Sequence, residues 1–406
     1  MVPWRVGHPL EPSQYEAVWL KATFECHKWD AYVGDSDTLA PFPLILRATA
    51  WREVAELAEA LTQEVFAAEQ ELLSRPDLHP FLKLAPPIRR VFKDPPQHHW
   101  TPGIARVIRI DFHWTDQGWR ISEANTDVPG AFNEAGGFTS LMAAYYPDAK
   151  PVGDPAVAMA QAMSQTVGVG ARIPLVHATA YSDDRQVMEY LADRMREQGL
   201  EPCLIAPDQL SWPQGQALIK TDWICQPADA LYRFFPAEWL PNLPQGSGWS
   251  HFFKDSHLPH CNPATALLTQ GKRFPLVWEH LKTPLSTWRK LLPETRDPRQ
   301  LTQDDDRQDW VAKPVWGREG EDIIMSGILS DQQWQQTWNR IRRSPDDWVV
   351  QQRFQTLPIA TPLGSCYPCL GVYTVAGSAV GAFVRLSKTP VIDGLAWNTA
   401  VLVADK

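Results

Sequence analysis

The sequence predicts an α/β fold of mixed, α+β character, and three segments support this prediction. Residues 49–73 place apolar side chains at helical spacing, and Thr49 is suited to cap the start of the helix. Residues 105–125 have the composition of two strands around a turn. From residue 172 a strand, a helix and a second strand follow one another, as in a parallel β-α-β unit. We therefore expect antiparallel and parallel sheets in one chain.

The antiparallel pair is predicted in the segments 105–114 (ARVIRIDFHW) and 119–125 (WRISEAN). Both are rich in β-branched and aromatic residues, and the turn cluster Thr115-Asp-Gln-Gly118 separates them. These features indicate a β-hairpin. One face of its first strand is expected to pack into the core, and the residues on that face are Ile110, Phe112 and Trp114.

A hairpin symmetric about Gln117 places four polar side chains on its other face. Asp111 then lies opposite Glu123, and Arg109 lies opposite Asn125, because alternate residues of a strand point to the same side. Two opposed carboxylates destabilise a sheet unless positive charge lies between them. Carboxylate and amide oxygens suit Mg²⁺, which keeps coordination positions for substrate phosphates. The alternative is a solvated polar face beside Arg109.

Other elements follow from helix and strand signals. A helix is expected to start at Asp154-Pro155, and residues 184–199 are the expected helix of the β-α-β unit. Residues 85–102 are Pro-rich and predicted to be irregular, and residues 285–309 are predicted to form a mobile loop. A helix is expected at 331–343, where Ser330 and Gln333 form a capping box, and three strands are expected to close the chain: 348–354, 369–375 and 378–387.

The segment Lys313-Pro-Val-Trp-Gly-Arg318-Glu-Gly320 is a candidate site for phosphate oxygens. Lys313 follows an apolar pair, as at the end of a strand. Gly317 and Gly320 allow the backbone to approach a ligand closely. Arg318 offers a planar fork of donors that suits phosphate or carboxylate. The chain contains no G-x-x-x-x-G-K-[ST] sequence, and the alternative is an exposed Gly-rich loop with incidental charges.

The composition makes several functional classes improbable. The chain has 406 residues, of which 44% are hydrophobic, so it is long enough for more than one lobe. Its net charge is −9 without a long basic run, so we expect no nucleic-acid partner. No signal-like or membrane-length apolar run occurs, and we expect a cytoplasmic protein with no membrane partner. Among six cysteines, the pair Cys366 and Cys369 is expected to be two ordinary thiols.

Seven short stretches, in order along the chain, resemble the glutathionylspermidine synthase-like branch of the ATP-grasp superfamily. The resemblance covers roughly residues 20–400. It does not include the separate amidase domain that some members of the family carry. The stretches are Arg109-Ile-Asp111, Glu123-Ala-Asn125, Ser182-Asp-Asp-Arg185, Tyr232-Arg-Phe-Phe-Pro-Ala-Glu-Trp239, Asn262-Pro with Lys272 ten residues on, Lys313 to Gly320, and Val349-Val-Gln-Gln352.

The resemblance implies an ATP-grasp fold with a pre-ATP-grasp α/β lobe and a circularly permuted order of motifs. In this order the metal-ligand strands come before the phosphate lysines, as they do in this chain. We expect an N-terminal helical and irregular segment at 1–104, a lobe with the metal hairpin at 105–260, and a nucleotide-binding lobe at 261–406.

The resemblance also implies a role for each matching residue. Three residues would bind Mg²⁺: Asp111, Glu123 and Asn125. The ATP contacts would come from the phosphate lysines Lys272 and Lys313, from the loop glycines Gly317 and Gly320, and from Gln351 and Gln352 near the adenine. Three arginines would face the acyl-phosphate chemistry: Arg109, Arg318 and Arg385.

The expected function is an ATP-dependent ligase that joins a small carboxylic acid or peptide to an amine through an acyl phosphate. Segments 285–309 and 317–320 are candidates for a cover that excludes water. Val128 and Gly130 stand where glutathione-using members carry hydroxyl residues, so glutathione is not the expected acid, and Lys388 is a doubtful third phosphate lysine. The alternatives are a nucleotide-binding regulatory protein without turnover and an ATP-dependent phosphotransferase.

Overall fold

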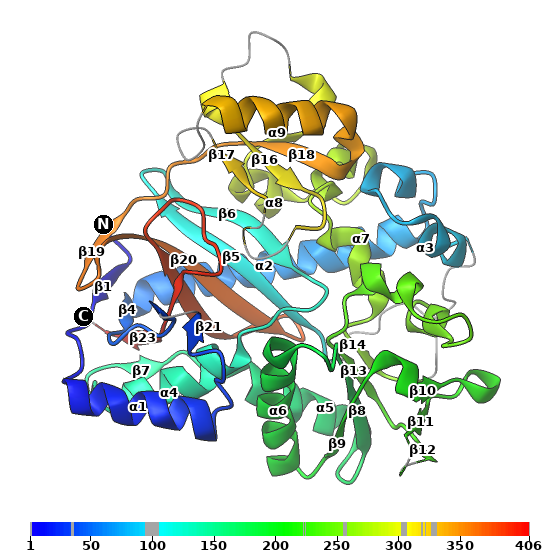
Figure 1. Cartoon of the computed structure of the whole chain (residues 1–406), viewed down its shortest axis with the longest axis horizontal. Coiled ribbons are helices and arrows are strands. Elements are labelled where there is room, and N and C mark those ends of the chain that lie inside the picture. The colour runs from blue at the N-terminus through cyan, green and yellow to red at the C-terminus, as the bar shows by residue number, and fades with distance from the viewer. Residues whose placement is uncertain are drawn as a thin grey trace.

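The structure of the chain is a computed structural model, and it describes residues 2–33, 36–93, 105–221, 223, 225–254, 258–301, 307–317, 320, 322–325 and 331–405. It has the mixed α/β character that the sequence predicts, with several sheets. Figure 1 shows an antiparallel sheet in the middle of the molecule, smaller sheets around it, and the two chain ends close together on one side.

The central sheet, called here the β20 sheet, carries the predicted hairpin. Helix α2 (Ala48–Leu73) packs against one face (Figure 1). Ile110 and Phe112 join its apolar side chains in the core. The opposite face is therefore free to carry polar groups. In order across the sheet, the strands are β22 (Trp397–Thr399), β21 (Ser378–Ser387), β20 (Gly364–Val375), β5 (Val107–Thr115) and β6 (Gly118–Asn125), with β19 (Ile359–Thr361) on β20.

A second antiparallel sheet, the β16 sheet, lies beside the tip of the hairpin (Figure 1). Helix α9 (Asp331–Arg343) covers it, and Trp334 and Ile341 are buried in the core that the helix and the sheet share. Ser330, the predicted cap of this helix, lies outside the described residues. The strands are β15 (Thr295–Arg296), β18 (Trp348–Gln352), β16 (Trp310–Pro314) and β17 (Ile324–Met325).

A parallel sheet contains the predicted β-α-β unit. Strand β8 (Arg172–Val176) pairs in parallel with β9 (Glu201–Ile205), and helix α6 (Ser182–Glu197) connects them. Helix α5 (Pro155–Val167) starts where the sequence predicts, because Asp154 caps it by accepting from the N–H groups of Ala156 and Val157. The sheet continues with β13 (Leu231–Arg233) and β14 (His260–Cys261).

A fourth sheet joins the two ends of the chain, which the sequence did not predict. Strand β23 (Val401–Ala404) pairs in parallel with β4 (Leu44–Arg47), and β1 (Trp4–Val6) and β7 (Lys150–Pro151) complete the order. The expected boundaries at 104/105 and 260/261 stay predictions. The remaining elements are α1 (Pro12–Glu25), α3 (Pro86–Val91), α4 (Thr139–Ala143), α7 (Leu267–Gln270), α8 (Ser286–Leu291), β2 (Tyr32–Val33), β3 (Ser36–Asp37), β10 (Leu210–Ser211), β11 (Leu218–Lys220) and β12 (Cys225–Pro227).

The prediction of a mobile loop at 285–309 is wrong for its first half. Helix α8 anchors this segment, because Trp288 and Leu291 are buried in the core and the indole Nε1 of Trp288 donates to the carbonyl of Leu61. Residues 302–306 lie outside the described residues. The Pro-rich stretch is also partly regular, since prolines at the first turn start helix α3. The chain closes with β22 and β23 after the predicted strands.

Candidate active site

The hairpin contains the predicted residue pairs, but its turn and its register differ from the prediction. Asp111 pairs with Glu123 and Arg109 pairs with Asn125. The turn is not centred on Gln117, because Thr115 pairs directly with Gly118. The register shifts by one after Phe112 pairs with Ile121, which leaves Ser122 as an extra residue. This β-bulge restores the pairing of the two acids, because a bulge adds one residue to one strand.

Asp111 is buried and held by two arginines. Its side chain is 1% exposed. Arg109 donates to both carboxylate oxygens, with Nε 2.8 Å from Oδ1 and Nη2 3.1 Å from Oδ2, and Nη2 of Arg385 lies 3.0 Å from Oδ2. Burial alone would lower the pKa of Arg109, but Asp111 outweighs it and raises that pKa above its ordinary value. The buried carboxylate is therefore held in place by hydrogen bonds from both arginines.

Glu123 lies close to the ammonium groups of Lys272 and Lys313. Nζ of Lys272 lies 3.1 Å from Oε2 of Glu123 and 2.7 Å from the carbonyl oxygen of Gly317. Burial alone would raise the pKa of Glu123, but the charges of Lys272 and Lys313 outweigh it and lower the pKa to about 2. The carboxylate is therefore ionised at neutral pH.

Lys313 lies at the end of β16 and reaches between two sheets. Its Nζ donates to Oε1 of Gln351 at 2.7 Å, within the β16 sheet, and to the carbonyl of Ser122 at 3.1 Å, on strand β6. The side chain is buried, and burial lowers its pKa to about 8 although Glu123 opposes this shift. Nε2 of Gln351 in turn donates to Oγ1 of Thr295 at 3.1 Å. The side chain of Lys313 is therefore largely protonated at neutral pH, and it lines a narrow cavity.

That cavity is narrow, about 80 Å³, and lies between the β16 sheet and the β20 sheet. Apolar side chains form much of its wall, and polar groups gather at the Lys313 end. An apolar slot with a few polar groups is typical of a small-molecule site. The lining includes Val311, Ile323, Met325, Phe354, Ile392, His113, Ser122, Glu123, Lys313, Gly320, Gln351, Gln352 and Arg385.

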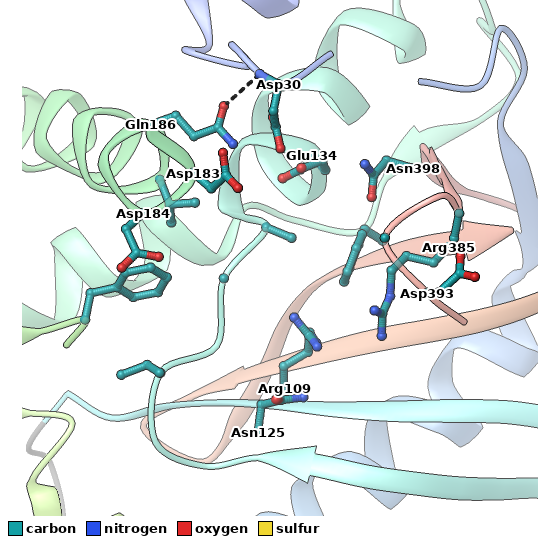
Figure 2. Close-up of a pocket in the computed structure, with 18 of the residues that line it drawn as sticks. Asp30, Arg109, Asn125, Glu134, Asp183, Asp184, Gln186, Arg385, Asp393 and Asn398 are labelled. Carbon is teal, nitrogen blue, oxygen red and sulfur yellow. Dashed lines mark hydrogen bonds between the residues drawn. The ribbon is translucent and has the colours of Figure 1, made fainter. Parts of the chain in front are cut away.

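A second, wider cavity of about 960 Å³ also borders the polar face of the hairpin. Figure 2 shows Arg109 and Arg385 pointing into it from the sheet, while acidic side chains lie on the opposite wall. On the basic side the lining includes Arg109, Asn125, Lys272, Gly317 and Arg385, and on the acidic side it includes Asp30, Glu134, Asp183, Asp184 and Glu238. The cavity therefore has a basic wall and a wall rich in acidic groups, two of which, Asp30 and Glu134, are paired with Lys28 at 2.6 Å.

Glu123 and Arg385 line both cavities. The narrow slot and the wide cavity therefore meet at these two side chains, beside Asp111 and Lys272. A group bound in the slot and a second group bound in the wide cavity would approach each other at a point surrounded by lysine and arginine.

Comparison with known proteins identifies the family. A family model described as glutathionylspermidine synthase preATP-grasp matches residues 46–403. The chain belongs to this family. The resemblance that the sequence motifs indicate is thus confirmed, and membership in a family of ATP-grasp-like ligases implies the use of ATP. No curated protein matches the sequence at a significant level.

Among solved structures, the chain is similar to a protein described as "Putative gamma-glutamylcysteine synthetase" from Methylobacillus flagellatus KT. The two are 14% identical, the match covers 82% of this chain and 86% of that chain, and the TM-score is 0.43.

The residues predicted to contact ATP are distributed over both cavities. Gly317 lines the wide cavity, and Gly320, Gln351 and Gln352 line the narrow one. Arg318 lies outside the described residues. Lys388 lines neither of these cavities, because its Nζ donates to the carbonyl of Leu363 and lies 5.5 Å from the ring centre of Trp397. It is therefore a poor candidate for a third phosphate lysine.

The candidate metal ligands fit a hard cation in kind. Glu123 and Asn125 line the wide cavity, and Glu123 pairs with the buried Asp111 across the hairpin, while Nδ2 of Asn125 lies 3.5 Å from Oδ2 of Asp111. The guanidinium groups of Arg109 and Arg385 supply the positive charge that the opposed carboxylates require. Within the described residues, no cluster of three or more His, Cys, Asp or Glu side chains offers a competing metal site.

Sequence reasoning missed parts of the site. His113 follows Arg109 and Asp111 at strand spacing, so alternation alone would have placed it on the polar face. The acidic wall comes from separate elements that no local pattern connects. Residues 390–396 were also missed, and they cover both cavities: 390–392 line the narrow one and 393–396 line the wide one.

Gly320 fixes how this 390–396 segment lies over the narrow cavity. Its φ angle is +73°, and a Cβ added there would lie 2.2 Å from the carbonyl oxygen of Ile392. The close approach therefore needs glycine. The hydroxyl of Ser387 donates to the carbonyl of Val391 at 2.9 Å and holds the same segment from the sheet side.

Cys366 and Cys369 are both buried free thiols on β20. No helix in the described part of the chain is long and apolar enough to cross a membrane.

Proposed function

We propose that this chain is an ATP-dependent carboxylate–amine ligase that forms an amide bond through an acyl-phosphate intermediate. The observation that carries the proposal is the meeting of the narrow and the wide cavity at Glu123 and Arg385. Family membership supports ligase chemistry and the use of ATP. The proposal includes the ATP-grasp arrangement of two sheets, with motifs in the permuted order in which the hairpin precedes Lys313.

ATP occupies the narrow cavity in this proposal. The apolar wall formed by Val311, Met325 and Ile392 suits a flat base, with Gln351 and Gln352 near it. Lys313 and Lys272 contact the phosphates, because an ammonium acts on phosphate as a point charge. Their positions at the bottom of the slot and beside Glu123 support this assignment. Gly317 and Gly320 let the backbone close on the nucleotide.

The carboxylic acid lies in the wide cavity, with its carboxylate at Arg109 and Arg385. A planar guanidinium suits a planar carboxylate, and both arginines are already oriented by Asp111. The acid oxygen attacks the γ-phosphorus, the bond from that phosphorus to the bridging oxygen breaks, and ADP leaves. Arginine and lysine offset the repulsion between the two anions. We assign Arg318 to the same carboxylate by its family motif.

The amine then completes the reaction from the acidic side of the wide cavity. Its nitrogen attacks the acyl carbon, phosphate leaves with one oxygen of the acid, and the nitrogen gives up a proton. Asp183 and Asp184 attract a cationic substrate to this wall (Figure 2), where Glu134 is already paired through Oε1 with Lys28. Glu134 offers an acceptor, since its Oε2 is buried without a hydrogen-bond partner among the described residues.

Mg²⁺ would be held by Asp111, Glu123 and Asn125, whose oxygens suit it. When bound, the ion would neutralise charge on the transferring phosphoryl group. The protein's own contribution is to keep Glu123 ionised and to hold Asp111 with two arginines before any ligand arrives. The 390–396 segment is the described element best placed to exclude water from both cavities.

The test is phosphate release from ATP with Mg²⁺ and a panel of acids and amines. A ligase releases ADP and phosphate only when an acid and an amine are both present, and it yields an amide that mass spectrometry detects. Lys313→Ala should raise the KM for ATP at least tenfold, roughly 1.4 kcal/mol, whereas Lys388→Ala is the matched control outside both cavities. Nucleotide binding without turnover on any pair, or a stable phosphorylated acid that no amine consumes, would replace the proposal by one of the alternatives.

A further inference from the structure

The β-bulge at Ser122 has a second consequence besides the register of the acids. Its extra residue lies between Ile121, which pairs with Phe112, and Glu123, which pairs with Asp111. A bulged residue leaves the regular ladder, so its backbone groups are available to other partners. The carbonyl of Ser122 uses this freedom and accepts from Nζ of Lys313 at 3.1 Å. The contact crosses from the β20 sheet to the β16 sheet.

His113 holds the side chain of the same residue. Its Nε2 lies 3.0 Å from Oγ of Ser122, and its Nδ1 lies 3.3 Å from Oγ1 of Thr356. The imidazole is 5% exposed and its ring centre lies 5.2 Å from that of Phe354. A neutral imidazole has one ring nitrogen that donates and one that accepts. Two hydroxyl partners satisfy both roles, because a hydroxyl can donate or accept.

Among the described contacts, two hydrogen-bonded pairs of residues therefore hold the ammonium group of Lys313. Gln351 fixes the ammonium from its own sheet, and Thr295 orients Gln351. Ser122 fixes it from the opposite sheet, and His113 orients Ser122. The mechanism described above assigns no role to His113 or Ser122, although both line the narrow cavity.

We propose that His113 and Ser122 are positioning residues for Lys313: the imidazole holds the bulge, and the bulge carbonyl holds the ammonium at the phosphate end of the narrow cavity. The inference rests on the proposed function, because it takes Lys313 as a phosphate contact. It adds residues that act through another residue, and neither needs to touch the reacting atoms.

The first experiment measures ATP affinity by calorimetry and steady-state kinetics in paired variants. Ser122→Ala removes the hydroxyl and Ser122→Thr keeps it. His113→Phe removes the ring nitrogens, and His113→Gln keeps a polar group of similar reach. Loss of one hydrogen bond predicts roughly a three- to tenfold weaker ATP affinity in Ser122→Ala and in His113→Phe. We expect kcat at saturating ATP within about twofold of the wild type, and recovery in Ser122→Thr and His113→Gln.

A double-mutant cycle tests whether the two residues act through one contact. The variant Ser122→Ala/His113→Phe should bind ATP no more weakly than the worse single variant, because residues in one contact are not additive. Independent, multiplying losses would contradict the proposed chain of contacts. A uniform drop in kcat and thermal stability without a change in ATP affinity would assign the pair a merely structural role and overturn the inference.

A second readout separates this inference from the proposed function. Lys313 of the nucleotide-free protein is labelled with acetic anhydride, and the rate is read from its peptide by mass spectrometry. Release from the bulge predicts at least about threefold faster labelling in Ser122→Ala and His113→Phe, with the wild-type rate in Ser122→Thr. Unchanged labelling in both overturns the inference. If the wild type does not bind ATP, the proposed function fails, and the labelling rate still decides whether the pair positions Lys313.

Discussion

Arg385 donates a 3.0 Å hydrogen bond to Asp111, although 274 residues separate them in the sequence. Arg109, two residues before Asp111, donates to both oxygens of the same carboxylate. A carboxylate this deeply buried needs such partners, because an unpaired buried charge is costly. The contact joins strand β21 to the hairpin where the two cavities meet, and in our proposal the two guanidinium groups it holds bind the substrate carboxylate.

The first prediction follows from this contact. Asp111→Asn keeps the side chain's shape and removes the charge that holds both arginines and, in our proposal, Mg²⁺. We expect kcat to fall roughly 10²-fold or more, which corresponds to about 2.7 kcal/mol of transition-state stabilisation. Steady-state kinetics measure the change, and circular dichroism checks the fold. Asp116→Asn, in the exposed turn of the same hairpin, is the matched control. Near-wild-type turnover of folded Asp111→Asn would remove Asp111 from the mechanism.

In the hairpin, the face on which each residue lies could be predicted from the sequence, but the bulge could not. Strand alternation is a local rule, so it placed Arg109 and Asp111 on one face and the apolar residues on the other. The β-α-β unit was predictable for the same reason, since its helix and strands each have their own period. The bulge at Ser122 was not predictable, because nothing in Trp119 to Asn125 marks the extra residue. The predicted pairs are still correct, because the extra residue of the bulge offsets the one-residue error in the predicted position of the turn.

Long-range features escaped the sequence for a different reason. The pairing of β4 with β23 joins segments over 350 residues apart, on the order of the whole chain, and no local signal links them. The polar composition of 285–309 suggested a loop, but Trp288 buries its indole against helix α2 and anchors the segment. The acidic wall likewise needs Asp30, Glu134 and Asp183 to be brought together by tertiary packing.

The second prediction is a pH dependence of ATP binding. Burial lowers the pKa of Lys313 to about 8, so the free protein loses this charge as the pH rises through 8. We expect kcat/KM for ATP to fall above that pH and Lys313→Arg to remove the fall, because arginine stays protonated. The same shift affects folding in the opposite direction. The unfolded lysine holds its proton to about pH 10.4, so stability from this group rises with pH between these values.

A pH profile of ATP affinity from pH 6.5 to 9.5 measures this effect, and urea unfolding at the same pH values separates binding from stability. Lys388→Arg serves as the control lysine. A flat wild-type profile, or a fall that Lys313→Arg leaves unchanged, would show that Lys313 is not the titrating contact.

The third prediction concerns Gly320. An alanine there would place its Cβ 2.2 Å from the carbonyl oxygen of Ile392 and would have to adopt a φ of +73°. The 390–392 segment must then move away from the narrow cavity. We expect the KM for ATP to rise roughly tenfold, about 1.4 kcal/mol, besides a backbone cost of about 1–2 kcal/mol in stability.

The matched control is Gly215→Ala, because Gly215 also has a positive φ, of +82°, but a Cβ there meets no atom within 4 Å. Both variants should lose similar stability in urea unfolding, and Gly320→Ala alone should lose ATP affinity. Equal ATP affinity in the two variants would show that the 390–396 segment does not shape the nucleotide site.

The fourth prediction is that glutathione is not the preferred acid. Val128 and Gly130 line the wide cavity beside the acidic wall, and neither offers a hydroxyl to a peptide. Pro129 between them has no N–H to donate. Polar groups of a tripeptide left unpaired there would cost about 1–3 kcal/mol each. Phosphate release with glutathione plus spermidine, compared with amino acids, short peptides and polyamines, measures the preference. Highest kcat/KM for the glutathione–spermidine pair would contradict it and leave the ligase proposal standing.

In the proposed mechanism, an acid oxygen attacks ATP at the junction of the two cavities. The most direct measurement uses a substrate acid labelled with ¹⁸O in its carboxylate, together with the amine, ATP and Mg²⁺, and determines the mass of the phosphate released. Each phosphate should carry one ¹⁸O, because the oxygen that attacked phosphorus leaves with it when the amide forms. Phosphate without ¹⁸O, formed while the amide accumulates, would contradict the acyl-phosphate route.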